Sequence, residues 1–151
     1  MQLSEQLARA FAAMGRLLNE DQGHEVLSRP DFAVLIRLPR AEEVAAGVEG
    51  VEGVRPRDLA RTEGLDPSTM SRRLASLTAR GLIHREPDPD DGRAQVLSLT
   101  EEGGRAVARE RARRVALVTD ALDGWGEEES AELARLLGRL TDTLEASRPT
   151  S

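Results

Sequence analysis

The 151-residue sequence contains no cysteine, no lysine and no tyrosine, and only two histidines. Without cysteine, disulfides, thiolate zinc sites and thiol-based redox sensing are excluded on chemical grounds. His24 and His84 are far apart in the sequence, so a metal site would have to rely mainly on carboxylates. No apolar run approaches the roughly 18 residues that cross a bilayer, and no signal-peptide pattern opens the chain. We therefore expect a cytoplasmic protein with no membrane partner.

The composition that remains is that of a soluble globular domain, with 39% hydrophobic and 32% charged residues. The net charge of −6 argues against a nucleic-acid partner until the charges are located. Residues 1–54 carry 5 Arg against 9 acids and residues 94–151 carry 8 against 11, whereas residues 55–85 carry 7 against 3. All 21 basic residues are Arg, which we attribute to codon or genome bias, although guanidinium is also the better fork for phosphate and guanine.

The basic segment has the pattern of two short helices joined by a tight turn. Pro56 begins the first helix and Gly64 ends it, and Asp66 with Pro67 caps a second helix that ends at Gly81. In that second helix an apolar stripe, Met70, Leu74 and Leu77, is predicted to be buried. The outer side is then small and polar, which suits close approach to a major groove. It consists of Ser68, Thr69, Ser71, Arg72 and Ser76.

Two strand-like runs follow, at residues 82–86 and 93–99, around the turn Pro87–Gly92. Proline, aspartate and glycine are the residues that tight turns favour. The pattern predicts a β-hairpin, or wing.

Helical patterns flank this module. Residues 3–18 form an amphipathic pattern, Thr100 caps a helix that runs to about Leu122, and residues 127–146 carry a leucine stripe. The terminal helices have more leucine than a small core absorbs, which favours a dimer interface. A basic face on the helix after Thr100 is interpreted as solvated surface or intersubunit pairing in preference to phosphate contact; it consists of Arg105, Arg109 and Arg113.

A further helix is predicted to begin at Ser28, with Phe32, Leu35 and Ile36 facing inward, and to end at Pro39. Residues 40–53 contain too many glycines for a long helix, although a turn or two fits between Arg40 and Ala46. We interpret residues 40–53 as a mobile surface loop, with a partner-binding insertion as the alternative.

With its elements in this order, the chain resembles the MarR family of transcriptional regulators over nearly its whole length. The matching segments are DLARTEGLDPSTMSRRLASLTARGLI at 58–83 and DPDDGRAQVLSLTEEG at 88–103. They carry the family's Leu-Ala, Pro-Ser-Thr and Arg-Gly-Leu landmarks, its Asp-x-Arg wing element, and Leu-Thr-x-x-Gly. Two motifs at the right separation are far more specific than one helix-turn-helix pattern alone.

The resemblance implies a mainly α fold with a small β-hairpin wing, in one domain over residues 1–151. Within it, residues 28–100 would form the winged helix-turn-helix DNA-binding region, and residues 1–20 and 101–146 the dimerisation helices. The implied function is that of a sequence-specific regulator, most often a homodimeric repressor on a palindromic operator of double-stranded DNA. In this family a small aromatic or phenolic effector most often releases the repressor.

The resemblance also implies roles for single residues. Base edges and nearby phosphates would be met by Ser68, Thr69, Ser71 and Arg72, with Arg73 as a further candidate whose alternative is an ordinary solvated arginine. Arg93 would enter the minor groove with Asp91 holding its guanidinium, and Arg85 would face the DNA backbone. Asp91 could equally be only a turn residue. The chain departs from many relatives in having Gly92 instead of an additional Arg, and in a longer 40–53 connection.

The sequence disfavours two other classes of function. A winged-helix protein-interaction module without DNA binding has no need of a polar reading helix together with a wing arginine. An enzyme lacks a recognisable nucleophile, metal set or phosphate loop, so we expect no catalytic residue, no cofactor and no metal ion. Pocket-lining candidates are better explained as ordinary core or surface residues. They are His24, His84, Phe11, Met14, Phe32, Ile36 and Trp125.

Overall fold

The computed structural model describes residues 2–19 and 27–147. Its elements are α1 (Gln2–Asn19), α2 (Arg29–Leu35), α3 (Ala41–Ala45), α4 (Pro56–Glu63), α5 (Pro67–Ala79), β1 (Ile83–Pro87), β2 (Gln95–Leu99), α6 (Glu101–Ala121) and α7 (Glu127–Ala146). A mainly helical chain with one β-hairpin confirms the predicted fold class. Within the described ranges, no helix is long and apolar enough to cross a membrane.

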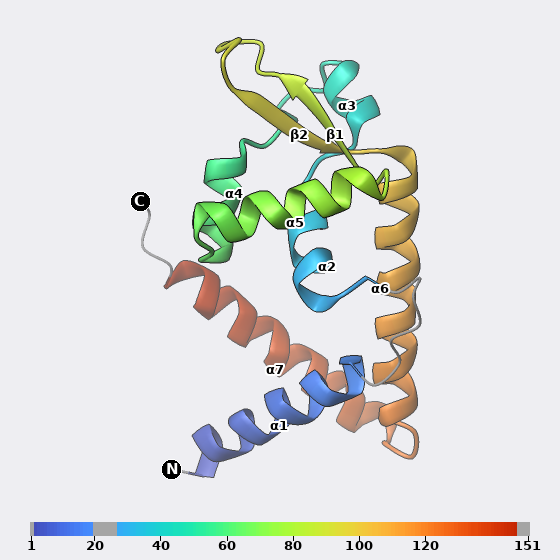
Figure 1. Ribbon diagram of the computed structural model, residues 1–151. Helices are drawn as coiled ribbons and strands as arrows, with labels where there is room; N and C mark the ends of the chain where they lie inside the picture. Colours follow the sequence, from blue (N-terminus) through green and yellow to red (C-terminus); the bar gives the residue numbers. More distant parts are fainter. Residues whose placement is uncertain (1, 20–26, 148–151) are drawn as a thin grey trace. The chain divides into compact units, whose positions relative to one another are not determined.

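The chain divides into two compact units, residues 1–114 and 115–151. The first unit holds the helix-turn-helix and the hairpin, and Figure 1 shows the hairpin above α4 and α5 with α2 below them. The second holds the end of α6 and all of α7. The division of function between residues 28–100 and the terminal helices stays a prediction.

The turn between α4 and α5 forms as the local sequence predicts. Gly64 adopts a left-handed conformation (φ 64°), and the amide of Leu65 donates to the carbonyl of Ala60 at 2.9 Å, which closes α4. Asp66 then caps α5 by accepting from the Thr69 amide at 2.9 Å. The end of α4 and the start of α5 are therefore determined by residues at those positions, independently of tertiary packing.

The core lies beneath α5. Met70, Leu74 and Leu77 are at most 1% exposed, which confirms the predicted stripe. They pack in one cluster with side chains of α2, α4, the hairpin and α6; its largest fully buried members also include Val34, Leu35, Leu59 and Leu97. Burying aliphatic side chains of this size gives roughly 1.5–3 kcal/mol each, so α5 is held mainly by its inner face.

The wing is the antiparallel pair of strands β1 and β2, in which Ile83 is paired with Leu99 and Pro87 with Gln95. Its inner edge is extended by two isolated bridges, from Arg40 to Leu99 and from Val54 to Leu97. Residues 40–53 thus contain the short helix α3 and are anchored at both ends to β2, which limits the expected surface loop to its middle.

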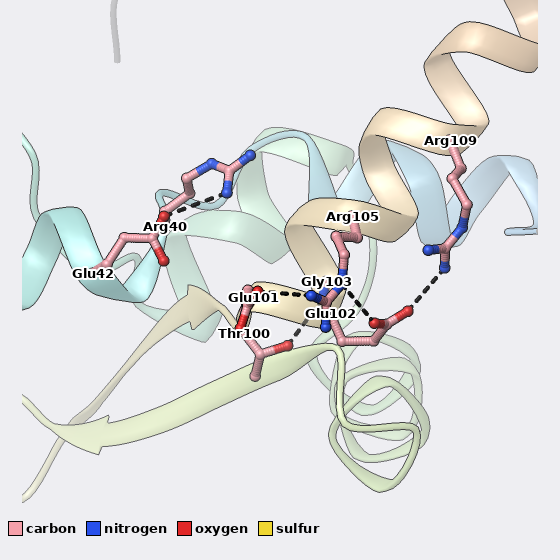
Figure 2. Close-up of polar contacts among 8 residues, drawn as sticks. All are labelled: Arg40, Glu42, Thr100, Glu101, Glu102, Gly103, Arg105 and Arg109. Atoms are coloured by element: carbon pink, nitrogen blue, oxygen red, sulfur yellow. Dashed lines mark hydrogen bonds and ion pairs between the residues drawn. The ribbon is translucent and has the colours of Figure 1, made fainter.

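Thr100 connects the wing to α6. Its hydroxyl donates to the Gly81 carbonyl at 2.6 Å. The same hydroxyl accepts from the Gly103 amide at 2.9 Å (Figure 2), so the predicted cap is confirmed. A Cβ at Gly103 would lie 2.0 Å from the carbonyl oxygen of Leu82. Only glycine permits this approach, which is the physical reason for the glycine in Leu-Thr-x-x-Gly.

Two predictions for α2 are wrong. The helix ends at Leu35, before the expected stop at Pro39, because tight i→i−3 hydrogen bonds follow it, from Arg37 to Val34 and from Leu38 to Leu35. Ile36 becomes the C-cap, and its side chain is 43% exposed instead of facing inward.

A buried carboxylate joins the middle of α6 to α2. Glu110 is 4% exposed and accepts from Arg113 and Arg114, and the Arg114 guanidinium lies 3.9 Å from the ring centroid of Phe32. Burial raises the pKa of Glu110, but the two guanidinium groups more than offset it, so its pKa lies below the ordinary value. Phe32 is therefore a core contact of α6, in agreement with the preferred interpretation.

Candidate nucleic-acid interface

The outward side of α5 presents the small polar surface that the sequence predicts. Ser68, Ser71 and Arg72 are exposed, and Thr69 is half-buried. They lie on the first two turns, on the side away from the buried Met70 and Leu74. A helix with this outer surface can approach a major groove without a bulky side chain in the way.

The first turn of α5 is organised by Asp66. Its carboxylate accepts from the Ser68 hydroxyl at 2.7 Å and from the Thr69 hydroxyl at 2.6 Å, in addition to the Thr69 amide. The hydroxyl of Thr69, its amide and the hydroxyl of Ser68 hold the pKa of Asp66 far below its usual range. The polar residues proposed to read DNA are thus already ordered in the free protein.

Arg72 and Arg93 are available to a partner. Within the part of the chain that the structure describes, the guanidinium groups of Arg72 and Arg93 make no hydrogen bond or ion pair, and both residues are exposed. Arg72 lies on α5, and Arg93 follows the turn between the two strands of the wing. Their positions agree with the roles that the resemblance implies.

Arg73 is placed differently from the expected DNA contact. Its Nη1 donates to Asp31 of α2 at 2.9 Å, and the same carboxylate accepts from Arg80 at 3.0 Å. The side chains of Arg73 and Asp31 are only 22% and 17% exposed. Arg73 is three residues after Met70, so it lies at the edge of the buried stripe of α5. Its side chain therefore turns toward α2 and attaches α5 to that helix.

Arg85 lies on β1 and is half-buried, with its Nε donating to the Thr78 hydroxyl at 3.2 Å. This neutral contact leaves the charge of the guanidinium uncompensated at the junction of α5 and the wing. The position is compatible with the expected contact to the DNA backbone.

Asp91 does not hold the guanidinium of Arg93. Its Oδ1 accepts instead from the backbone amide of Arg93 at 3.1 Å, which is the behaviour of a turn residue. The charged pair of this region joins Asp88 to Arg55, whose Nε lies 2.5 Å from Asp88 Oδ2. Sequence reasoning missed both members of that pair.

Other arginines are satisfied by neighbouring acids. Figure 2 shows Arg105 reaching Glu101 and Glu102, at 2.6 and 3.0 Å, and Arg109 reaching Glu102 at 2.8 Å. The interpretation of this face as solvated surface is compatible with these pairs for Arg105 and Arg109. It is wrong for Arg113, whose half-buried side chain pairs with the buried Glu110.

The alternative ligand candidates do not converge on one site. His24 lies outside the described residues, and His84 is exposed on β1. In the described ranges, no group of three or more histidine and acidic side chains is arranged to hold a metal ion. Phe11, Met14 and Trp125 are 66%, 45% and 49% exposed, so the preferred interpretation of them as core is wrong for the single chain.

A reading helix with a polar outer side, a preceding helix joined by a glycine turn, and a hairpin carrying an exposed arginine define a winged helix-turn-helix. A family model described as the MarR family matches residues 43–94. YxaD of Bacillus subtilis, described as an uncharacterized HTH-type transcriptional regulator, is 34% identical over 86 residues, which cover 57% of this chain and 60% of YxaD. The alignment therefore spans less than two thirds of that relative.

Two solved structures resemble the chain over more of its length. The PcaV transcriptional regulator of Streptomyces coelicolor, in complex with its natural ligand, is 30% identical with a TM-score of 0.55, covering 93% of this chain and 89% of PcaV. CouR of Rhodococcus jostii RHA1, bound to p-coumaroyl-CoA, is 27% identical with a TM-score of 0.69, covering 99% and 94%. The chain belongs to the MarR family of transcriptional regulators.

Proposed function

We propose that this protein is a homodimeric repressor that binds a palindromic operator and is released by a small-molecule effector. Residues 28–100 contact DNA, and residues 1–20 and 101–146 form the dimer. The regulators named above are not described as enzymes, and the chain itself acts by binding alone.

One observation carries the DNA-binding part of the proposal: Arg72 and Arg93 are exposed cations without a protein partner in the described residues, on a helix and a wing of suitable shape. Arg72, with Ser68, Thr69 and Ser71, reads base edges in the major groove. Arg93 enters the flanking minor groove, and Arg85 contacts the DNA backbone. Arg73 acts through Asp31 by positioning α5, and Asp91 shapes the turn that presents Arg93.

The apolar surface of the terminal helices supports the dimer. Leu3 of α1, and Leu136, Leu137 and Leu144 of α7, are 47–73% exposed in the single chain. Exposed leucines in such number on amphipathic helices mark an interaction surface. A second copy buries these side chains and sets the distance between the two reading helices, about one DNA turn or roughly 34 Å for adjacent half-sites.

The effector part of the proposal is supported by the relatives. PcaV is described with its natural ligand and CouR with p-coumaroyl-CoA, whose acyl group is phenolic. An effector of small aromatic or phenolic class would change the spacing of the reading helices, and a few ångströms would lose simultaneous contact with both half-sites.

The DNA-binding proposal is tested by selecting bound duplexes from a random pool and measuring affinity for the consensus at several salt concentrations. A palindromic consensus is expected. Arg72→Ala should lower both affinity and sequence preference, by about 1–3 kcal/mol, whereas Arg85→Ala should weaken all duplexes alike and flatten the salt dependence by about one unit. Absence of any enriched sequence would favour the interaction-module alternative.

The dimer is tested by sedimentation equilibrium. Leu137→Glu places a charge among the exposed leucines of α7 and should shift the protein toward monomer. Ala131→Glu adds the same charge on the opposite side of the helix, where the residue is also exposed, and should leave the dimer intact. Equal effects of the two substitutions would contradict the proposed interface.

A further inference from the structure

The ion pair between Arg55 and Asp88 joins two parts of the winged helix that are 33 residues apart in the sequence. Arg55 is the N-cap residue of α4, and Asp88 directly follows β1. The Asp88 side chain is 5% exposed and that of Arg55 is 29% exposed. A contact of 2.5 Å between charged groups with so little water around the carboxylate is a structural pair, unlike the exposed pairs elsewhere on the surface.

The second oxygen of Asp88 folds the wing turn. Oδ1 accepts from the amide of Asp90 at 2.9 Å and from the amide of Asp91 at 3.3 Å. Asp91 in turn accepts from the amide of Arg93 at 3.1 Å. A short series of contacts therefore runs from the N-terminus of α4 through Asp88 to the backbone of Arg93. The amide of Asp90 and the guanidinium of Arg55 hold the pKa of Asp88 below its usual range, so the carboxylate is charged at neutral pH.

The rest of the attachment is backbone. Val54 and Leu97 exchange two hydrogen bonds, of 3.0 and 2.9 Å, at the base of the wing. Nearer the turn, the Asp88 amide donates to the Ala94 carbonyl at 3.0 Å, which closes the hairpin but does not attach it to a helix. In the described ranges, Arg55 makes the one side-chain hydrogen bond between the 87–93 turn and another element.

We propose that the Arg55–Asp88 pair is a latch that fixes the wing turn against α4 and so places Arg93 at a set distance from the reading helix α5. The inference rests on the proposed DNA-binding function. Arg55 and Asp88 are positioning residues here, since they act on DNA through Arg93. A wing held before binding does not need to be ordered on the duplex, which lowers the entropic cost of the Arg93 contact.

Simple electrostatics and the latch predict opposite effects of neutralising Asp88. A carboxylate near DNA repels phosphate, so removing its charge without any structural role would strengthen binding. If Asp88 holds the wing, Asp88→Asn weakens binding although a repulsive charge is gone. Asp90 offers a matched control because it is an exposed acid in the same turn, and no hydrogen bond from its side chain is seen in the described residues.

The experiment measures two quantities for the full wild-type chain and for four variants: Asp88→Asn, Asp90→Asn, Arg55→Lys and Arg55→Ala. The first is hydrogen exchange of the wing amides in the free protein, and the second is affinity for the selected operator over a range of salt concentrations. Asp88→Asn should speed exchange at Asp90 and Asp91 and weaken operator binding by about 3- to 10-fold, with an unchanged salt slope. Arg55→Lys keeps the charge but loses the planar fork, so it should give a smaller change in the same direction. Asp90→Asn should bind as the wild type or more tightly.

Binding of Asp88→Asn as tight as that of Asp90→Asn, or unchanged wing exchange, overturns the latch. A flatter salt slope for Arg55→Ala together with undiminished binding by Asp88→Asn would make Arg55 a phosphate contact and overturn it as well. If the wild type binds no duplex, the proposed function fails, and wing exchange in the free protein alone decides whether the latch exists. Denaturation of each variant confirms that it is folded.

Discussion

The reading helix α5 and the wing carry the two arginines proposed to contact DNA, but the helix and the wing are held in the fold by different contacts. The inner face of α5 is buried by Met70, Leu74 and Leu77, and Asp31 fastens its flank through Arg73 and Arg80. Within the described residues, the wing turn at 87–93 is attached to another element by one side-chain ion pair, and residues 89–93 are exposed.

The difference indicates which contacts set each position. The protein interior beneath α5 is densely packed and resists deformation. The side chains that stabilise the fold therefore also fix the direction of α5. The wing turn has few buried apolar contacts and can be displaced at little cost to the fold. Substitutions under α5 should therefore change stability and DNA binding together, while substitutions in the wing should change DNA binding alone.

The largest effect is expected beneath α5. Leu77→Ala leaves a cavity where the side chain is 0% exposed, and should lower the free energy of unfolding by about 2–5 kcal/mol in chemical denaturation. Ser76→Ala, at an exposed neighbouring position, should change it by less than about 0.5 kcal/mol. Similar values for the two variants would mean that the inner face does not hold the helix.

The flank of α5 comes next. Asp31→Ala leaves the half-buried Arg73 without its carboxylate and should lower the free energy of unfolding by about 1–3 kcal/mol. Glu42→Ala removes an acid from an exposed pair with Arg40 at 3.4 Å, where about 0–1 kcal/mol is expected. Denaturation at low and at high salt distinguishes the cases, since a half-buried pair is screened less. A loss for Asp31→Ala no greater than that for Glu42→Ala would contradict the fastening role.

A smaller effect is expected at the start of α5. Asp66→Ala removes the cap and should lower the melting temperature by about 2–4 °C, measured by circular dichroism. Because the pKa of Asp66 is lower in the folded than in the unfolded protein, its contribution is fully present above the ordinary aspartate pKa. It is lost as the pH falls below about 4. The difference between wild type and variant should therefore shrink in acid, and a difference independent of pH would exclude the cap as its source.

The smallest effect on stability is expected in the wing. A Cβ at Gly92 would meet no atom within 4 Å, and its φ is not left-handed, so Gly92→Arg should be accommodated without strain. Stability should change by less than about 0.5 kcal/mol, while all duplexes bind more tightly with a salt slope steeper by about one unit. Gly92→Ala, which adds no charge, should leave the slope unchanged. An unaltered slope for Gly92→Arg would place position 92 away from the phosphates.

The sequence was informative where structure depends on neighbours along the chain. The bounds of α4 and α5 follow from Pro56, Gly64, Asp66 and Gly81, because caps and left-handed turns are chosen by residues within one helical turn. The buried stripe of α5 follows from its periodicity.

What the sequence did not show depends on pairs that are far apart. Asp31 and Arg73 are 42 residues apart, and a chain with 21 arginines gives no local sign of which one meets which acid. The sequence therefore did not show that Arg73 pairs with Asp31, and a DNA contact of Arg73 stays a prediction. Asp88 stands between Pro87 and Pro89 in the wing turn, whereas Asp91 is two residues from Arg93, so the sequence favours Asp91 as the charged partner of Arg93. Only the folded chain brings Arg55 to Asp88.

The hydroxyl protons of Ser68 and Thr69 have a further consequence for base recognition. Both point to the carboxylate of Asp66, so in the proposed complex each hydroxyl oxygen would face the major groove with lone pairs only. Such an oxygen can accept from the amino groups of adenine or cytosine but has no proton for the acceptor atoms of guanine. By taking the protons of both hydroxyls, Asp66 would make Ser68 and Thr69 hydrogen-bond acceptors toward DNA. The operator should therefore place an adenine or cytosine amino group where these two residues meet the duplex.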